Sequence, residues 1–195
     1  TGTENTLIGG GAGDALTSGG RNTAIGYEAL SAEDETGYAV AVGYQALRAQ
    51  NSGGNSYNVA VGYNAGESVS TGIENTLLGG KAGDALTTGS YNVAIGMDAL
   101  DAEDTGSRNV AIGYNSLKAL NYDGNGYNVA VGFDAGKAVS TGIYNTIIGG
   151  LAGDALTTGS NNIAIGYLAL SAENAHGKNI AIGVNALAVQ DAGVD

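Results

Sequence analysis

The 195-residue sequence contains no proline, no cysteine and no tryptophan, and it has only one histidine, one methionine and one phenylalanine. The absence of proline favours an uninterrupted backbone ladder, because proline cannot donate a hydrogen bond to a sheet. The absence of cysteine excludes disulfides and thiolate metal sites. Basic residues are also scarce: 7 stand against 19 acidic ones, which gives a net charge of −12. That balance argues against nucleic acid as a partner, because phosphates attract a basic surface.

Glycine is abundant instead, with 35 residues. Each glycine in a helix interior costs roughly 1 kcal/mol relative to alanine, so long helices are disfavoured. The sequence shows no signal peptide and no stretch of about 18 apolar residues that would insert into a membrane. It begins and stops inside a repeat, so we expect it to be a piece of a longer protein.

The repeat is a motif of the form Asn-(Thr/Val)-Ala-(Ile/Val)-Gly, which recurs at steps of 17 or 19 residues. Four such coils make a 70-residue unit, which divides the chain into residues 1–70, 71–140 and an incomplete 141–195. A fixed period of this kind is typical of solenoids, in which each repeat packs against its neighbours. We therefore expect one all-β domain over residues 1–195, a parallel β-solenoid (β-roll) of about eleven coils and roughly 53 Å long.

The first position of the motif is asparagine in every coil except one, where Ala39 replaces it. Stacked asparagines are expected to form an amide ladder, each side chain bonding its equivalent one coil away. The expected ladder comprises Asn5, Asn22, Asn58, Asn75, Asn92, Asn109, Asn128, Asn145, Asn162 and Asn179.

Three residues after this position stands a branched aliphatic residue in every coil, and we expect this column to form the ladder of the core. Glycine follows it each time, where a corner requires either a positive φ or a close backbone approach. The expected core ladder comprises Ile8, Ile25, Val42, Val61, Leu78, Ile95, Ile112, Val131, Ile148, Ile165 and Ile182.

Side chains of a strand alternate between its two faces, so the aliphatic column and the intervening alanine column lie on opposite sides. Both sides are apolar, and a short coil has little left with which to cover the second one. Small alanine side chains would let neighbouring chains approach closely. We therefore expect a homo-oligomer, with a trimer favoured, and a wider single-chain solenoid that folds over its own second face is the alternative.

Residues 22–30 (NTAIGYEAL) and 162–170 (NIAIGYLAL) resemble the repeats of bacteriophage tail-fibre proteins. They are also similar to the Asn-Ser-Val-Ala-Ile-Gly repeats in the heads of trimeric autotransporter adhesins. The adhesin resemblance covers essentially the whole chain and implies a left-handed parallel β-roll with three chains side by side. The coils here are longer than in those adhesins, and Thr, Val or Ile replaces the serine after asparagine, so the handedness and the cross-section stay open.

The resemblance implies a structural, non-enzymatic shaft or adhesin segment of an extracellular or virion fibre, which rigidly spaces or presents a receptor-binding tip. A phage tail fibre is favoured. The alternative is a bacterial surface adhesin head or an extracellular filament that binds host or matrix, and a calcium-binding β-roll comes after that. The implied partners are further copies of the chain and a cell-surface glycan or receptor, without membrane insertion.

Catalytic chemistry finds little support in the residues. His176 is the only histidine, and a nucleophile–base pair needs a base that a third group holds in place. Carboxylates gather at residues 33–35, at 103–104 and at Glu173, whereas glycoside hydrolysis requires two carboxyls that face a sugar cleft. We expect these acidic groups to form a charged outer face that keeps fibres apart. No catalytic residue and no enzyme activity are therefore expected.

Residues 9–16 (GGGAGDAL) resemble the calcium-binding nonapeptide Gly-Gly-x-Gly-x-Asp-x-Leu of secreted β-rolls, and the motif recurs at 79–86 and 149–156. The weak calcium candidates are Asp14, Asp84 and Asp154. Alanine replaces the motif's third glycine in each copy, and calcium takes roughly six to eight oxygen ligands, more than one motif per 70 residues supplies. We expect structural turns with no metal or other cofactor, and calcium is the alternative.

The two 19-residue coils contain the segments 51–57 and 121–127, which are rich in glycine, asparagine and tyrosine. Loops on rigid scaffolds often carry binding residues, and this composition suits sugar contacts as well as it suits plain turns. The candidate ligand-contact residues are Asn55, Tyr57, Asn125 and Tyr127. A row of aromatic residues after the glycine column is interpreted as outer packing, with a glycan track as the alternative; it consists of Tyr27, Tyr44, Tyr63, Tyr114, Phe133 and Tyr167.

Overall fold

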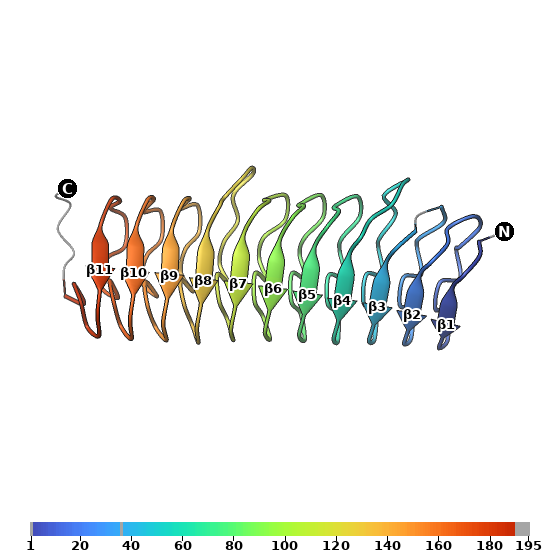
Figure 1. Ribbon diagram of the computed structural model, residues 1–195, viewed down its shortest axis with the longest axis horizontal. Helices are drawn as coiled ribbons and strands as arrows, with labels where there is room; N and C mark the ends of the chain where they lie inside the picture. The colour runs from blue at the N-terminus through green and yellow to red at the C-terminus, as the bar shows by residue number, and fades with distance from the viewer. Residues whose placement is uncertain (1, 36, 190–195) are drawn as a thin grey trace.

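The computed structural model describes residues 2–35 and 37–189 as a parallel β-solenoid, one coil stacked on the next along a straight rod (Figure 1). Each coil contributes one three-residue strand, and the strands form a single parallel sheet in sequence order. Within the described ranges there is no helix. The prediction of an all-β parallel β-solenoid is therefore confirmed. The strands are β1 (Thr6–Ile8), β2 (Thr23–Ile25), β3 (Val40–Val42), β4 (Val59–Val61), β5 (Thr76–Leu78), β6 (Val93–Ile95), β7 (Val110–Ile112), β8 (Val129–Val131), β9 (Thr146–Ile148), β10 (Ile163–Ile165) and β11 (Ile180–Ile182).

The strands pair in the register of the repeat. Ala24 of β2 lies beside Ala41 of β3, and Ala111 of β7 lies beside Ala130 of β8, although the coil between the second pair is two residues longer. The extra residues are absorbed in the turns 51–57 and 121–127, which project beyond the neighbouring coils in Figure 1. Each column of the repeat is therefore a continuous row along the rod.

The alanine face of the sheet, and not the aliphatic face as expected, points into the coil. The middle residue of every strand from β2 to β11, an alanine in most, is buried inside the coil. The flanking β-branched residues point outward and are half-exposed or exposed, as at Val61 (39 %) and Ile148 (38 %). The assignment of the aliphatic column from Ile8 through Ile95 to Ile182 as the core ladder is therefore wrong. That ladder exists, but it covers the outer face of the sheet.

The turns explain why alanine is inside. Three columns of each coil adopt the left-handed conformation, represented in the second coil by Glu28 (φ 51°), Leu30 (φ 54°) and Tyr38 (φ 64°). Residues other than glycine seldom adopt positive φ, and a coil with three such positions closes tightly. A row of alanine fits the narrow interior that results, whereas a row of isoleucine is too wide for it.

Two interior columns exchange side-chain size between coils. In most coils the strand carries alanine and the turn carries leucine, as with the fully buried pair Ala94 and Leu100. The coil of β5 reverses this order, with Leu77 in the strand and Gly83 in the turn. A Cβ atom on Gly83 would lie 2.9 Å from Leu77 Cδ2, so the leucine occupies the space that the glycine leaves. The coil of β4 carries alanine and glycine at these two positions, and Leu77 of the next coil fills the space beside Gly66, where a Cβ atom would lie 2.5 Å from Leu77 Cδ1.

The glycine column after the strands meets both of the conditions expected for it. Gly26 has a φ of 137°, and a Cβ atom on it would lie 2.2 Å from the carbonyl oxygen of Gly43 in the next coil. The backbones of successive coils therefore touch at this corner, where no side chain can be accommodated.

The asparagine column ties each coil to itself and to the next. Asn75 Oδ1 accepts a hydrogen bond from the backbone N–H of Asn92 at 2.9 Å, while its Nδ2 donates to the carbonyl of Gly89 across the same coil at 2.9 Å. Asn92 repeats both bonds, to Asn109 and Gly106. The column thus forms a ladder, but its principal bonds join side chain to backbone rather than amide to amide.

Candidate functional site

Three carboxylates lie inside the solenoid. Glu33, Glu103 and Glu173 have no exposed surface, and they recur once in each 70-residue unit. The expectation that the acidic clusters form an outer charged face is wrong for these three residues, although the adjacent Glu35 is exposed. The equivalent position in other coils is a buried aliphatic residue such as Leu86. Alignment of the coils at this position therefore indicates, from the sequence, that the column faces inward.

Glu103 orders the turn that follows it. Its Oε1 accepts hydrogen bonds from the backbone N–H groups of Gly106 at 2.9 Å and Asp104 at 3.2 Å, and both carboxylate oxygens lie 3.4 Å from the N–H of Tyr122 in the next coil. Burial raises the pKa of Glu103 to about 7, although these backbone hydrogen bonds act in the opposite direction. Because the carboxyl is fully buried, it holds a turn in place rather than facing a cleft.

His176 contacts the equivalent carboxylate in the third unit. Its Nδ1 lies 2.9 Å from Glu173 Oε1, which also accepts the backbone N–H groups of His176 at 2.8 Å and Ala175 at 3.1 Å. Burial alone would raise the pKa of Glu173, but these hydrogen bonds outweigh it and lower the pKa below its ordinary value. The arrangement is that of a carboxylate that caps the turn after it.

The three weak calcium candidates occupy one column, separated by four coils. Asp14, Asp84 and Asp154 therefore lie roughly 19 Å apart in succession, at about 4.8 Å per coil, and contribute to no common site. Burial raises the pKa of Asp84, and the neighbouring Glu67 raises it further. Nowhere in residues 2–35 and 37–189 do three or more His, Cys, Asp or Glu side chains gather as metal ligands would.

The projecting turns bring together polar and aromatic groups from adjacent coils. Asn55 lines a pocket of about 270 Å³ with Thr3, Ser18, Arg21 and Tyr38, among other residues. Arg21 donates to Glu4 at 2.7 Å and to the Tyr38 hydroxyl, so most of its charge is already paired.

In the second unit, Asn125 Oδ1 accepts a hydrogen bond from the Arg108 guanidinium. All four loop candidates (Asn55, Tyr57, Asn125 and Tyr127) are exposed. Their role in ligand contact stays a prediction.

A second aromatic row lies immediately before the asparagine column, and it was not recognised from the sequence. Arg108 stacks over the rings of Tyr91 and Tyr127 at 4.9 and 5.9 Å, and Tyr127 stacks on Tyr144 at 5.6 Å. Tyr38 and Tyr57 form a further stacked pair at 5.1 Å. Alignment of the residue that precedes each asparagine would have found this row, although acidic, basic and amide residues interrupt it.

The first aromatic row is stacked along the rod. Tyr44 lies between Tyr27 at 5.3 Å and Tyr63 at 5.4 Å, with ring planes 18° and 15° apart, and Tyr114 stacks on Phe133 at 5.4 Å. Tyr44 has a neighbouring ring on both faces, and each of the other four rings has one on one face. A continuous glycan track would need those faces free for sugar rings, so the geometry favours the outer-packing interpretation.

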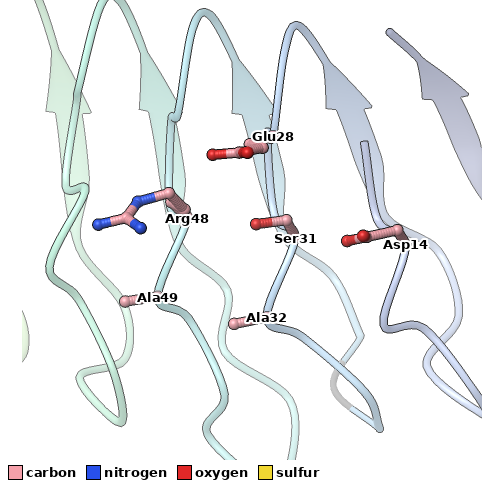
Figure 2. Close-up of a pocket in the computed structure, with 6 residues that line it drawn as sticks. All are labelled: Asp14, Glu28, Ser31, Ala32, Arg48 and Ala49. Carbon is pink, nitrogen blue, oxygen red and sulfur yellow. The ribbon is translucent and has the colours of Figure 1, made fainter. Parts of the chain in front are cut away.

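A shallow face with an alanine floor runs beside the turns (Figure 2). In the first unit it forms a depression of about 410 Å³ between Asp14, Glu28 and Arg48, with Ala32 and Ala49 in a lower row. In the second unit Ala102, Ala119 and Ala138 line a larger depression of about 610 Å³, bordered by Asp101, Lys118, Lys137 and Asp154.

The basic groups on this face each contact a carboxylate. Arg48 contacts Glu67 and Lys118 contacts Asp98, each at 2.7 Å, and Lys137 contacts Asp134 at 3.1 Å. The face is thus a row of surface ion pairs over small side chains. Such pairs contribute little individually to stability.

No known protein family, curated protein or solved structure matches this chain. Among the described residues, none forms a helix of the length and apolarity that crossing a membrane requires.

Proposed function

We propose that the chain is a rigid, non-catalytic structural segment of an extracellular or virion fibre, such as a phage tail-fibre shaft, which spaces or presents a receptor-binding tip. The observation that carries this proposal is the unbroken parallel sheet, whose strands pair in one register from β1 to β11. Each coil is tied to the next through the sheet, the asparagine ladder and the glycine contacts. A rod built in this way resists bending because every column would have to slip at once.

The proposal includes side-by-side assembly with further copies, in a trimer, through the outer face of the sheet. This face carries two rows of Thr, Val, Ile and Leu and no charged side chain within the strands. With a tyrosine row on each side, it measures roughly 50 by 20 Å, on the order of 1,000 Å². A standard protein interface buries about 800 Å² on each partner, so the area suffices for a stable contact.

A second copy suits this face better than a globular partner does. The outer rows repeat at every coil along the whole rod, and a partner with the same coil spacing meets them in register over the full length. The two outer rows themselves carry no charge, and of the 19 acidic residues Glu4 and Glu74 lie beside them, in the second aromatic row. Assembly would therefore bury apolar surface without bringing the main acidic groups together.

Mass measurement by light scattering on a size-exclusion column tests this proposal directly. We expect the wild-type chain, with a mass of 19.2 kDa, to elute as a trimer. The pair of substitutions Ile95→Asp and Ile112→Asp, on the outer face, should yield a folded monomer because both side chains are only partly buried within one chain. The matched pair Ala102→Asp and Ala119→Asp, on the alanine-floored face, should leave the mass unchanged.

A folded wild-type monomer would contradict the assembly. Equal effects of the two pairs of substitutions would show that the outer sheet face is not the contact surface. The rod itself is tested by small-angle scattering, which should give a particle about 50 Å long for a single chain.

The second candidate function, an adhesin head that contacts host or matrix, is supported by the projecting turns 51–57 and 121–127 (Figure 1). They are exposed and stand on a rigid scaffold, as binding loops do. Shortening both turns by two residues, to the length of the other coils, should leave the rod intact and abolish surface binding if the segment is an adhesin.

A further inference from the structure

The first aromatic row is interrupted by glycine once in each 70-residue unit, at Gly10, Gly80 and Gly150. The backbone of Gly80 and Gly150 lies outside the left-handed region, so their φ angles do not require glycine. A Cβ atom on Gly80 would have no neighbour within 4 Å, and one on Gly150 would make only ordinary contacts with the ring of Tyr167, the nearest at 3.6 Å. Neither backbone strain nor crowding explains these glycines, and their effect is to leave gaps in the row.

The gap over Gly150 has an aromatic ring on each side. Phe133 precedes it by one coil and Tyr167 follows it by one coil, and each is about half exposed (56 % and 52 %). Two coil spacings of about 4.8 Å place these rings roughly 10 Å apart. Tyr44 fills a place of the same width between Tyr27 and Tyr63. The molecule itself therefore shows that one flat ring fits between two rings at this spacing.

We propose that the gap over Gly150 is a binding slot for one planar aromatic ring, such as an aromatic side chain presented by a partner. The gap over Gly80, between Tyr63 and Met97, is a second slot of the same kind. A ring in either slot would complete the stack, and aromatic pairs in such offset arrangements are favourable. Methionine sulfur also makes favourable contacts with aromatic rings.

The residues beside the Gly150 slot favour an aromatic ring over a sugar, whereas Lys81 and Asp98 follow Gly80 and Met97 at the second slot. The residues that follow Gly150 and Tyr167 in the chain are Leu151 and Leu168. They offer no hydrogen-bond partner for sugar hydroxyls. A single unassembled chain contains both slots, which lie in the first aromatic row at the border of the outer sheet face.

Two residues that occur only once in the chain report on the two slots separately. Met97 is the only methionine and Phe133 the only phenylalanine, so selective isotope labelling of each gives an assigned NMR signal. N-acetyl-L-tyrosinamide is the probe. We expect saturable upfield shifts of the Met97 methyl and of the Phe133 ring signals, with a dissociation constant on the order of 1 mM.

Filling a slot from within the chain should block the probe at that slot alone. Gly80→Tyr should weaken binding reported by Met97 at least tenfold and leave the Phe133 response unchanged, and Gly150→Tyr should do the reverse. Gly54→Tyr is the matched control, because Gly54 has open space around it but lies in a projecting turn. It should leave both responses as in the wild-type chain.

The proposal is overturned if neither wild-type signal shows a saturable shift, or if the filled variants respond as the wild type does. It is also overturned if methyl glucoside shifts the two signals at lower concentration than the tyrosine probe and the filled variants abolish that effect. The slots would then be sugar sites.

Discussion

Gln50 Oε1 accepts a hydrogen bond from Asn58 Nδ2 at 2.5 Å inside the solenoid, in the one coil where Ala39 interrupts the asparagine ladder. In the second unit, Asn109 stands in the position of Ala39 and Leu120 in the position of Gln50. There, Asn109 Oδ1 accepts the Asn128 side-chain N–H at 3.3 Å and its backbone N–H at 3.2 Å. Gln50 thus supplies the side-chain acceptor for Asn58 that alanine at position 39 cannot provide.

This relationship predicts a compensated exchange. Gln50→Leu should lower the free energy of unfolding by about 1–2 kcal/mol, because one N–H of the buried Asn58 amide loses its acceptor. Ala39→Asn combined with Gln50→Leu reproduces the second unit and should restore wild-type stability. Urea denaturation of the four members of the double-mutant cycle measures the coupling, and strictly additive effects would contradict it.

Two adjacent glycines should respond in opposite ways to the same substitution. Gly79→Ala places a Cβ atom 2.5 Å from the carbonyl oxygen of Gly96 at a φ of 138°, and we expect a loss of at least about 3 kcal/mol or a failure to fold. Gly80→Ala meets open space and should change stability by less than about 0.5 kcal/mol. Thermal unfolding followed by circular dichroism compares the two. Equal effects would show that the backbone contact is not restrictive.

The exchange of size between strand and turn predicts another rescue. Leu77→Ala should destabilise by about 2–5 kcal/mol because it opens a cavity in the interior. Gly83→Leu alone should also destabilise, through overpacking against Leu77. The double variant gives the coil of β5 the same pattern as Ala111, Leu117 and Leu120 and should recover most of the loss. Denaturation midpoints measure the recovery, and a double variant less stable than either single variant would disprove the compensation.

The buried Glu103 predicts a pH dependence of stability. Its pKa of about 7 in the folded chain exceeds the ordinary value of 4.5. The protonated Glu103 carboxyl therefore contributes fully to the free energy of unfolding below about pH 4.5. This contribution, on the order of 3 kcal/mol, is lost as the pH rises through 7.

Glu103→Gln should remove this slope, so that the variant is more stable than the wild type at pH 8. Unfolding free energies between pH 4 and 9 test this prediction. The exposed Glu74→Gln serves as the control and should leave the wild-type slope in place. A wild-type slope that persists in Glu103→Gln would assign the pH dependence to another group.

Much of the fold follows from the sequence by itself. The 17- and 19-residue spacing, the absence of proline and the β-branched residues that flank each alanine predict one short parallel strand per coil at the places where β1 to β11 occur. The invariant glycine after each strand predicts the close approach seen at Gly26 and Gly43. These features are local or strictly periodic, so alignment of the coils reveals them without coordinates.

Only the tertiary structure decided which side of the strand is the interior. Alternation places Ala94 and Ile95 on opposite faces, but it does not determine which of the two faces points into the coil. The inward face is set by the turns, in which residues other than glycine, such as Leu100 and Tyr91, adopt positive φ. The identity of these residues does not predict that conformation. Because those turns close the coil on the alanine side, the aliphatic ladder lies outside, the carboxyl of Glu103 lies inside, and the aromatic rows border the outer face.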